Sequence, residues 1–296
     1  MVMMNIESFA PPLSSAVHPP LFARTQGEGE TVVCLHSSTG SHAQWRELDA
    51  MLAGRCRVIA PDLHGHGRSP AWPVDAADEL NVDARAVTAL LDGAESRTAP
   101  GVHLVGHSYG GAVALQIALR APQRVRSLTL YEPVAFGVIR QAAPDDTAFG
   151  EIAEIADSVE ALVRRGELDG AARVFVNYWG GAGAWDSLGL AQRSAVLARI
   201  GTVPRHFAAL FAATWRAPLL ARLSIPTLLI HGAETRAPAR RVADLLAASL
   251  PRVQRLEIAG AAHLGPITHA PTVAAAMRDH LETHGLHRVR SHADGA

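Results

Sequence analysis

The sequence of 296 residues contains no lysine, so all 27 of its basic residues are arginines. Without lysine the chain cannot form a Schiff base with a carbonyl substrate, hold a phosphate with a P-loop lysine, or use a Ser–Lys dyad. The arginines are scattered and the formal net charge is −1, so nothing indicates a nucleic-acid partner. These absences leave a small-molecule substrate as the expected partner.

Cysteine and long apolar runs are also scarce. The two cysteines, Cys34 and Cys56, each lie inside an apolar strand-like run, where a thiol behaves as a small buried hydrophobic group. Two such residues do not indicate a disulfide framework. The N-terminus lacks a basic segment followed by a long apolar block, and no apolar run has the length of a membrane span. We therefore expect a cytoplasmic protein without a membrane partner, and separately we expect a monomer or a homodimer.

The sequence does contain enough apolar material for one large core. Hydrophobic residues make up 48% and charged residues 19%, which argues against wholesale disorder. Short apolar runs alternate with segments of helical periodicity, and this alternation predicts an α/β fold with a doubly wound, mostly parallel sheet. The expected strands are 31–35, 56–60, 102–105, 126–131, 227–230 and 253–258, and the clearest helices are 75–92, 110–121, 237–250 and 270–283.

One connection is much longer than the others. The predicted strand that ends at Tyr131 is separated from the strand near Thr227 by far more residues than a crossover needs. The intervening residues have the pattern of several helices, so we expect an inserted helical cap over the strand ends. The expected division is a core of 16–135 and 217–285, a cap of 136–216, and loose termini at 1–15 and 286–296.

The strongest motif is "GHSYG" at residues 106–110, which fits the G-x-S-x-G pattern of a nucleophile elbow between a strand and a helix. In such an elbow the serine lies in a strained turn where a Cβ on either flank would clash. The turn lifts the serine hydroxyl out of the sheet, and the helix behind it presents backbone N–H groups to an anion. Ser108 is therefore the expected nucleophile.

With this motif the chain resembles the α/β-hydrolase family, over roughly residues 20–285. "LHSSTG" at 35–40 looks like the oxyanion-hole loop of that family, and "PDLHGHGRS" at 61–69 like its strand-to-helix signature. "IAGAAHLGP" at 258–266 looks like the segment that carries the catalytic histidine. The resemblance implies that Ser108 attacks a carbonyl carbon without any cofactor or metal ion.

A serine nucleophile needs a base, and neutral imidazole suits that role near pH 7. Among the 15 histidines, His263 stands out because it lies in the loop after the final predicted strand, which in this fold lies over the nucleophile. His107 is adjacent to Ser108, but it is expected to point inward and to order the surrounding loops.

The tetrahedral intermediate needs hydrogen-bond donors. By resemblance these are the backbone N–H groups of Tyr109 and Ser38. Ser37 stands where many relatives have glycine, so its hydroxyl is a further candidate donor.

The acid that orients the histidine is ambiguous. In the commonest arrangement of the family a carboxylate lies three residues after Gly232, but Thr235 stands there, and threonine cannot stabilise an imidazolium. The nearest carboxylate is Glu234. Some members of the family place the acid after the preceding strand, where this chain has Glu132. We favour Glu132, and we keep Glu234, or the lack of a functional acid, as alternatives.

Aromatic residues of the cap are expected to serve partly as helix–helix core and partly as an apolar pocket above Ser108. The pocket residues that we expect are Ser37, Phe136, Trp179, Phe211 and Leu264. The sequence thus predicts a cofactor-free serine hydrolase acting on a small carboxylic ester with an apolar acyl or aromatic part. The alternatives are a C–C bond hydrolase, a lactonase or a hydroxynitrile lyase on the same fold, and a ligand receptor without turnover.

Overall fold

The computed structural model describes residues 20–72, 79–92 and 101–286. Its core is one seven-stranded sheet in the order β1-β3-β2-β4-β5-β6-β7, which is parallel except at the edge strand β1. The strands are β1 (Ala23–Gln26), β2 (Thr31–Leu35), β3 (Arg57–Pro61), β4 (Val102–His107), β5 (Val125–Tyr131), β6 (Thr227–Gly232) and β7 (Val253–Ile258). The predicted doubly wound, mostly parallel α/β sheet is confirmed, and its strand order reverses between β2 and β4.

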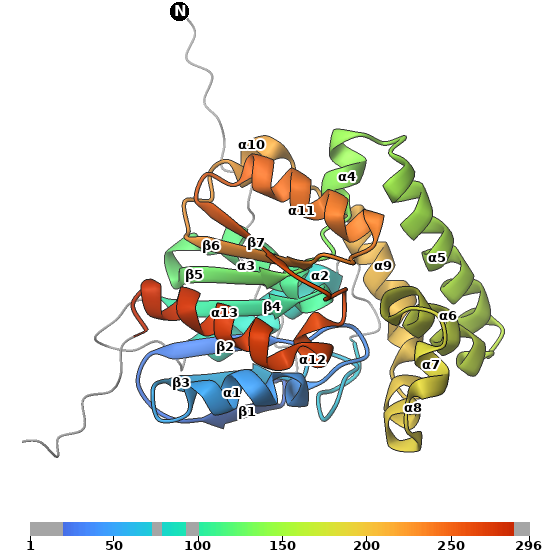
Figure 1. Cartoon of the computed structure of the whole chain (residues 1–296), viewed down its shortest axis with the longest axis horizontal. Helices are drawn as coiled ribbons and strands as arrows, with labels where there is room; N and C mark the ends of the chain where they lie inside the picture. Colours follow the sequence, from blue (N-terminus) through green and yellow to red (C-terminus); the bar gives the residue numbers. More distant parts are fainter. Residues whose placement is uncertain (1–19, 73–78, 93–100, 287–296) are drawn as a thin grey trace, which may run out of the picture.

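Helices cover both faces of the sheet, because side chains along each central strand alternate between two apolar clusters (Figure 1). In β2, for example, Val33 packs into one cluster and Val32 into the other. Helices α1 (Arg46–Leu52) and α13 (Ala270–Thr283) contribute to one cluster, and α2 (Glu79–Leu91), α3 (Tyr109–Arg120) and α11 (Ala237–Ser249) to the other. Burial on both faces explains why the strands read as continuous apolar runs. The predicted helix at 75–92 corresponds to α2, and its predicted start at residue 75 lies outside the described residues.

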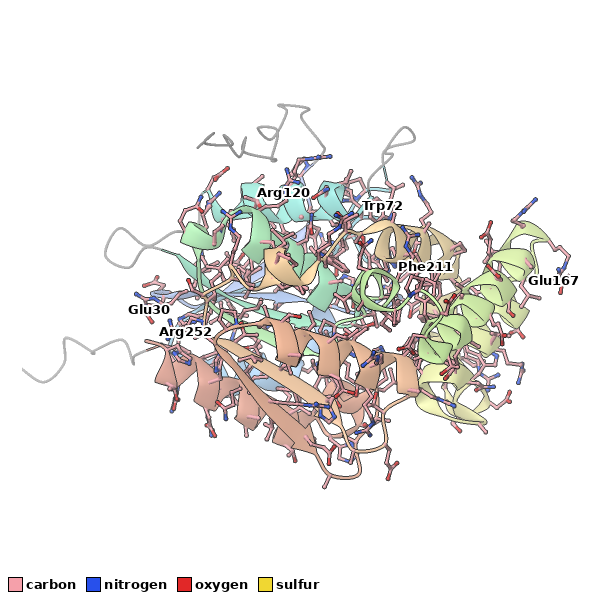
Figure 2. The ribbon with its side chains drawn as sticks, turned by 90° about the horizontal axis from the view of Figure 1, so that it is seen from above. Glu30, Trp72, Arg120, Glu167, Phe211 and Arg252 are labelled. Atoms are coloured by element: carbon pink, nitrogen blue, oxygen red, sulfur yellow. The ribbon has the colours of Figure 1, made fainter. Side chains whose placement is uncertain are left out.

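A group of helices connects β5 to β6, and those from α5 to α9 extend beyond the carboxyl ends of the strands, on the right of Figure 1. It consists of α4 (Gly137–Ala142), α5 (Thr147–Arg164), α6 (Leu168–Gly180), α7 (Ala184–Ser187), α8 (Leu190–Leu197), α9 (Val203–Ala212) and α10 (Ala217–Leu220). We call α5 to α9 the cap helices. In Figure 2, Glu167 marks their outer end and Phe211 the place where they meet the rest of the chain. A separate cap domain bounded at 136 and 216 stays a prediction.

Several short elements complete the fold. They are α12 (Gly265–Thr268) and the 3₁₀ helices η1 (His42–Trp45), η2 (Pro122–Arg124) and η3 (Ile200–Thr202). Both cysteines are buried and unpaired, as their apolar neighbours predict. No helix within the part of the chain that the structure describes combines the length and the apolar character needed to cross a membrane.

Cap aromatics mainly pack against one another. Phe211 lies 6.0 Å from Phe136, 5.2 Å from Phe149 and 5.8 Å from Phe207, measured between ring centroids. Fully burying a phenylalanine side chain contributes about 1.5–3 kcal/mol to the free energy of unfolding, which applies to Phe136 and Phe207, whereas Phe149 and Phe211 are only partly buried. This packing joins α4, α5 and α9 and holds the cap helices above the strand ends.

Candidate active site

Ser108 occupies the turn between β4 and α3 with backbone angles φ 54° and ψ −123°, a conformation that costs about 1–3 kcal/mol in a residue other than glycine. The flanking glycines make this turn possible. A Cβ on Gly106 would lie 2.5 Å from the carbonyl oxygen of Gly110, and a Cβ on Gly110 would overlap the backbone of Leu35. Ser108 therefore stands at the carboxyl end of β4, beside the point where the strand order reverses, which is where open α/β sheets bind their ligands.

His263 lies in the loop after β7, and two side chains fix that loop. The hydroxyl of Tyr131 donates to the carbonyl oxygen of Ala262 at 2.7 Å, and Nε2–H of His107 donates to the carbonyl oxygen of His263 at 2.8 Å. His107 is thus turned inward and holds the loop. The Oγ of Ser108 donates to Nε2 of His263 at 2.9 Å, in a position that is almost fully buried.

Glu132 follows β5 at a positive φ of 39° and is fully buried. Its Oε2 accepts from Nδ1–H of His263 at 2.8 Å and from the hydroxyl of Thr235 at 2.6 Å, while its Oε1 accepts from the backbone N–H of Gly232 at 2.9 Å. Burial disfavours the charged form, but the hydrogen bonds and the attraction of His263 outweigh it and hold the pKa of Glu132 below its ordinary value. The carboxylate is therefore ionised at neutral pH.

Thr235 occupies the place where the family resemblance leads one to expect an acid, and its hydroxyl donates to the carboxylate of Glu132. Glu234, the alternative acid, is exposed, and its backbone N–H donates to the carbonyl oxygen of Ala261. The structure thus brings Glu132 to His263 and leaves Glu234 at the surface. The supporting donors, Thr235 and Gly232, were not identified from the sequence, because nothing local to them indicates an acid on the neighbouring strand.

A narrow cavity of about 10 Å³ opens beside Ser108, room for roughly one water molecule. Its lining consists of Ser38, Ser108, Val134, Phe136, Phe175, Trp179, His206, Phe207 and Leu210. Phe136 and Trp179 were expected there. Three other expected pocket residues do not line it, for different reasons.

The first is Ser37, whose hydroxyl donates to Oε1 of Gln44 at 2.9 Å and is therefore engaged outside the cavity. The second is Phe211, which packs behind Phe136 and Phe207. The third, Leu264, follows His263 in the loop but is not part of the lining. In all three cases the choice of side chains depends on backbone paths that residue spacing does not specify.

The loop at residues 36–40 is fastened by two buried histidines. His36 donates from Nδ1 to the carbonyl oxygen of Ser37 at 2.8 Å and accepts the N–H of Leu63 at Nε2. His66 accepts the N–H of Thr39 at Nε2, 3.1 Å away. Burial lowers the pKa of His36 to about 4 and that of His66 to about 3, so both rings are neutral at pH 7 and each has a lone pair to accept these bonds.

Two cap residues contact the side chains around Ser108. The ring of Trp179 stacks on that of His263 with centroids 3.9 Å apart, so it covers the histidine. His206 on α9 makes a 2.8 Å hydrogen bond with Oγ of Ser38. Sequence reasoning left His206 aside because it belongs to no motif; its only signal is that it is a lone polar ring on an apolar helix face.

The arrangement offers no evident metal site. Among the described residues, no cluster of three or more His, Cys, Asp or Glu side chains could hold a metal ion. The polar side chains that line the cavity beside Ser108 are instead the hydroxyls of Ser38 and Ser108 and the ring of His206. Tyr109 opens α3, and the N-terminal turn of a helix favours negative charge. The other side chains that line the cavity beside Ser108 are aliphatic or aromatic.

Comparison with known proteins agrees with this architecture. A sequence model of the alpha/beta hydrolase fold matches residues 30–270. The chain is 31% identical to a pimeloyl-(acyl-carrier protein) methyl ester esterase of Chromobacterium violaceum, over 89% of this chain and 98% of that protein. A shorter stretch, 38% of this chain, is 37% identical to a 2-hydroxy-6-oxo-6-phenylhexa-2,4-dienoate hydrolase of Burkholderia cepacia and covers 39% of it. Among solved structures, a hydrolase from Pseudomonas aeruginosa PA01 superimposes with a TM-score of 0.71 at 24% identity, over 88% of this chain and 93% of that one.

The extent of these matches limits what they say about activity. Three other curated relatives are 41–44% identical, but the chain spans only 29–41% of their length. The solved structure, at 24% identity, supports the fold alone. The esterase and the dienoate hydrolase are named after different substrates, so these matches do not identify the substrate of this chain.

Proposed function

The chain belongs to the α/β-hydrolase family, and we propose that it is a serine hydrolase that cleaves a small carboxylic ester with an apolar acyl or aromatic part, through an acyl-enzyme and without a cofactor. The observation that carries the proposal is one hydrogen-bonded chain at the strand ends. In it the Ser108 hydroxyl donates to Nε2 of His263, and Nδ1–H of His263 donates to Glu132. This is the arrangement in which a base can take the serine proton while an acid fixes its tautomer.

In the first half of the proposed reaction, Oγ of Ser108 attacks the ester carbonyl carbon while its proton passes to Nε2 of His263. The carbonyl π electrons move to oxygen, and the N–H groups of Tyr109 and Ser38 are proposed to hold that oxyanion. Glu132 lies opposite the new positive charge on the imidazolium. Collapse of the intermediate expels the alcohol, which receives the proton from His263 and leaves an acyl-serine.

In the second half, a water molecule gives a proton to Nε2 of His263 and attacks the acyl carbon. The same donors stabilise the second oxyanion. When this intermediate collapses, the bond to Ser108 breaks, the carboxylic acid is released, and the proton returns to the serine oxygen. All groups then have their starting protonation.

The chemistry of the cavity favours an uncharged acyl part. Apart from the hydroxyls of Ser38 and Ser108 and the ring of His206, its lining is aliphatic and aromatic. A carboxylate or ammonium group bound there would lose its hydration without an opposite charge to replace it. The cavity has room for only about one water molecule, so it must widen to admit an acyl group. Short acyl groups require the least movement of the cap.

Similarity to the dienoate hydrolase raises C–C bond hydrolysis as a second candidate. Such a substrate carries a carboxylate, and the cavity lining contains no arginine to pair with it. The ester hydrolase is therefore the better supported reading. Turnover of a vinylogous diketo acid at a rate comparable to that of simple esters would reverse this ranking.

The proposal is tested with p-nitrophenyl esters of graded acyl length. We expect steady multiple turnover by the wild-type chain, and a loss of more than about a thousandfold in kcat in Ser108→Ala, since the nucleophile is removed and packing is not. Mass spectrometry after treatment with a fluorophosphonate should place one adduct on Ser108. A single slow burst without turnover would instead support a ligand receptor, and full activity of Ser108→Ala would exclude covalent catalysis by this serine.

A further inference from the structure

Two adjacent serines in the loop at residues 36–40 use their hydroxyls differently. Ser37 donates to Gln44, outside the cavity. Ser38 lines the cavity together with Ser108, and its Oγ lies 2.8 Å from Nδ1 of His206. The sequence suggests Ser37 as the additional hydroxyl donor to a substrate, but in the structure Ser38, and not Ser37, lines the cavity.

His206 is held in one orientation by its surroundings. The side chain is 1% exposed, its ring lies parallel to that of Tyr109 at a centroid distance of 3.8 Å, and it stacks on His66 at 5.3 Å. Burial, reinforced by the nearby His66 and His36, holds the pKa of His206 well below its ordinary value. The ring is therefore neutral and carries a single N–H proton.

The position of that proton decides what the Ser38 hydroxyl can do. Nε2 of His206 is buried and has no hydrogen-bond partner among the described residues. A proton on Nε2 would leave a buried donor unpaired, whereas a proton on Nδ1 is used in the bond to Ser38 and leaves only an unpaired acceptor. Buried unpaired donors are the rarer case in proteins. The Nδ1–H tautomer is favoured, so Oγ of Ser38 accepts.

A hydroxyl that accepts from His206 keeps its own hydrogen for another acceptor. Ser38 and Ser108 line the same narrow space. We propose that the Ser38 hydroxyl is a third donor to the oxyanion formed at the ester carbonyl, and that His206 is a positioning residue that directs this hydroxyl. The proposal rests on the ester hydrolysis proposed above, to which it adds a catalytic group and a residue that acts through it.

The same contacts link the cap to the oxyanion site. His206 belongs to the cap helix α9, and Arg199, which precedes η3, donates to the carbonyl oxygen of Thr39 at 2.9 Å. Thr39 itself has a positive φ of 61°, so the loop has a conformation that needs such support. Two cap side chains thus hold adjacent residues of the loop in place.

The decisive variant is Ser38→Ala, which removes the hydroxyl and keeps the backbone N–H. Loss of one oxyanion donor typically lowers kcat by about 100- to 1,000-fold, so we expect a fall of about 100-fold with KM changed by less than about threefold. Ser37→Ala is the matched control, one residue away in the same loop, and should keep kcat within about threefold. A kcat of Ser38→Ala equal to that of wild type would overturn the proposal, and so would a change confined to KM.

The role of His206 is tested by a double-mutant cycle. His206→Phe keeps an aromatic ring against Tyr109 but removes the Nδ1 donor, so kcat should fall nearly as far as in Ser38→Ala. Combined with Ser38→Ala it should add less than about threefold, because both changes remove the same interaction. His206→Asn, whose amide nitrogen can replace Nδ1–H, should recover most of the activity. Losses that multiply in the double variant would show that His206 acts by another route.

These experiments also separate the two proposals. If the wild-type chain turns over no ester, the proposed function itself fails. If the wild type is active, Ser108→Ala is inactive and Ser38→Ala is unchanged, then only the third donor is excluded. Thermal unfolding of each variant shows whether a loss of kcat reflects a loss of folded protein.

Discussion

Replacing Glu132 by glutamine keeps the shape of the side chain and removes its charge. The carboxylate now accepts at both oxygens: Oε2 accepts from His263 and Thr235, and Oε1 from the N–H of Gly232. An amide has one oxygen and one NH₂ group, so it cannot reproduce this pattern in either orientation.

If the amide oxygen faces His263, the NH₂ group meets the N–H of Gly232 where Oε1 lay, 2.9 Å away. A buried donor is then unpaired, at a cost of about 1–3 kcal/mol. If the NH₂ group faces His263 instead, Nδ1 must become the acceptor and the ring proton moves to Nε2. That tautomer cannot take the proton of Ser108. The second orientation therefore avoids the unpaired donor but removes the base.

We therefore expect kcat of Glu132→Gln to fall by up to about ten-thousandfold, the size of the corresponding asparagine effect in a serine protease triad, or roughly 5 kcal/mol in activation free energy. The assay is p-nitrophenyl ester turnover, with thermal unfolding to check the fold. Glu234→Gln, an equivalent change at an exposed carboxylate, is the control and should cost less than about threefold. A loss below about tenfold in Glu132→Gln, or a larger loss in Glu234→Gln, would refute the assignment of the acid.

Two further predictions concern the cap and the buried histidines. Trp179→Leu should lower kcat by about 5- to 20-fold and Trp179→Phe by less, because an aromatic face over His263 stabilises the imidazolium that forms during the reaction; equal kcat in both variants and wild type would contradict this. Burial lowers the pKa of His36 to about 4 and of His66 and His103 to about 3, so below about pH 6.5 the unfolded chain binds protons that the folded chain does not. The free energy of unfolding, measured in urea, should then fall as the pH drops from about 6.5 toward 4. It should fall less steeply in His103→Asn than in wild type, and identical slopes for the two proteins would contradict the lowered pKa of His103.

The fold was predictable where the sequence pattern is continuous. The central strands are buried on both faces, so their apolar runs stand out, and each predicted strand matches an observed one to within a few residues. The edge strand β1 was missed because its four residues, Ala23–Gln26, are mostly exposed and have no apolar pattern. The short helix α1 was missed as well, since Arg46–Leu52 is too brief to show a clear period.

Within the candidate site, motifs were sufficient for residues whose local backbone is special, and insufficient for residues defined by contacts between distant segments. Ser108 is flanked by the glycines that its strained turn requires, so the sequence identifies it. His206 has no such local mark, because its significance lies in a bond to Ser38 across 168 positions of sequence. A lone histidine on an apolar helix is more often a core residue, and only coordinates distinguish the two cases.

The position of Glu132 shows why spacing alone could not choose between two glutamates as the proposed acid. Strands β5 and β6 are parallel neighbours, with Tyr131 opposite Ile230, and the N–H of Glu132 donates to the carbonyl oxygen of Ile230. The residues that follow the two strands therefore enter the same space beside His263, and a carboxylate from either strand can approach Nδ1. At Glu132 the positive φ of 39° accompanies a side chain that accepts from Gly232, the last residue of β6, and from Thr235 in the loop that follows. Thr235 cannot be the acid, because its hydroxyl carries no negative charge. It does suit an acid that follows β5, because it supplies a hydroxyl donor at a place where a second carboxylate would repel the first.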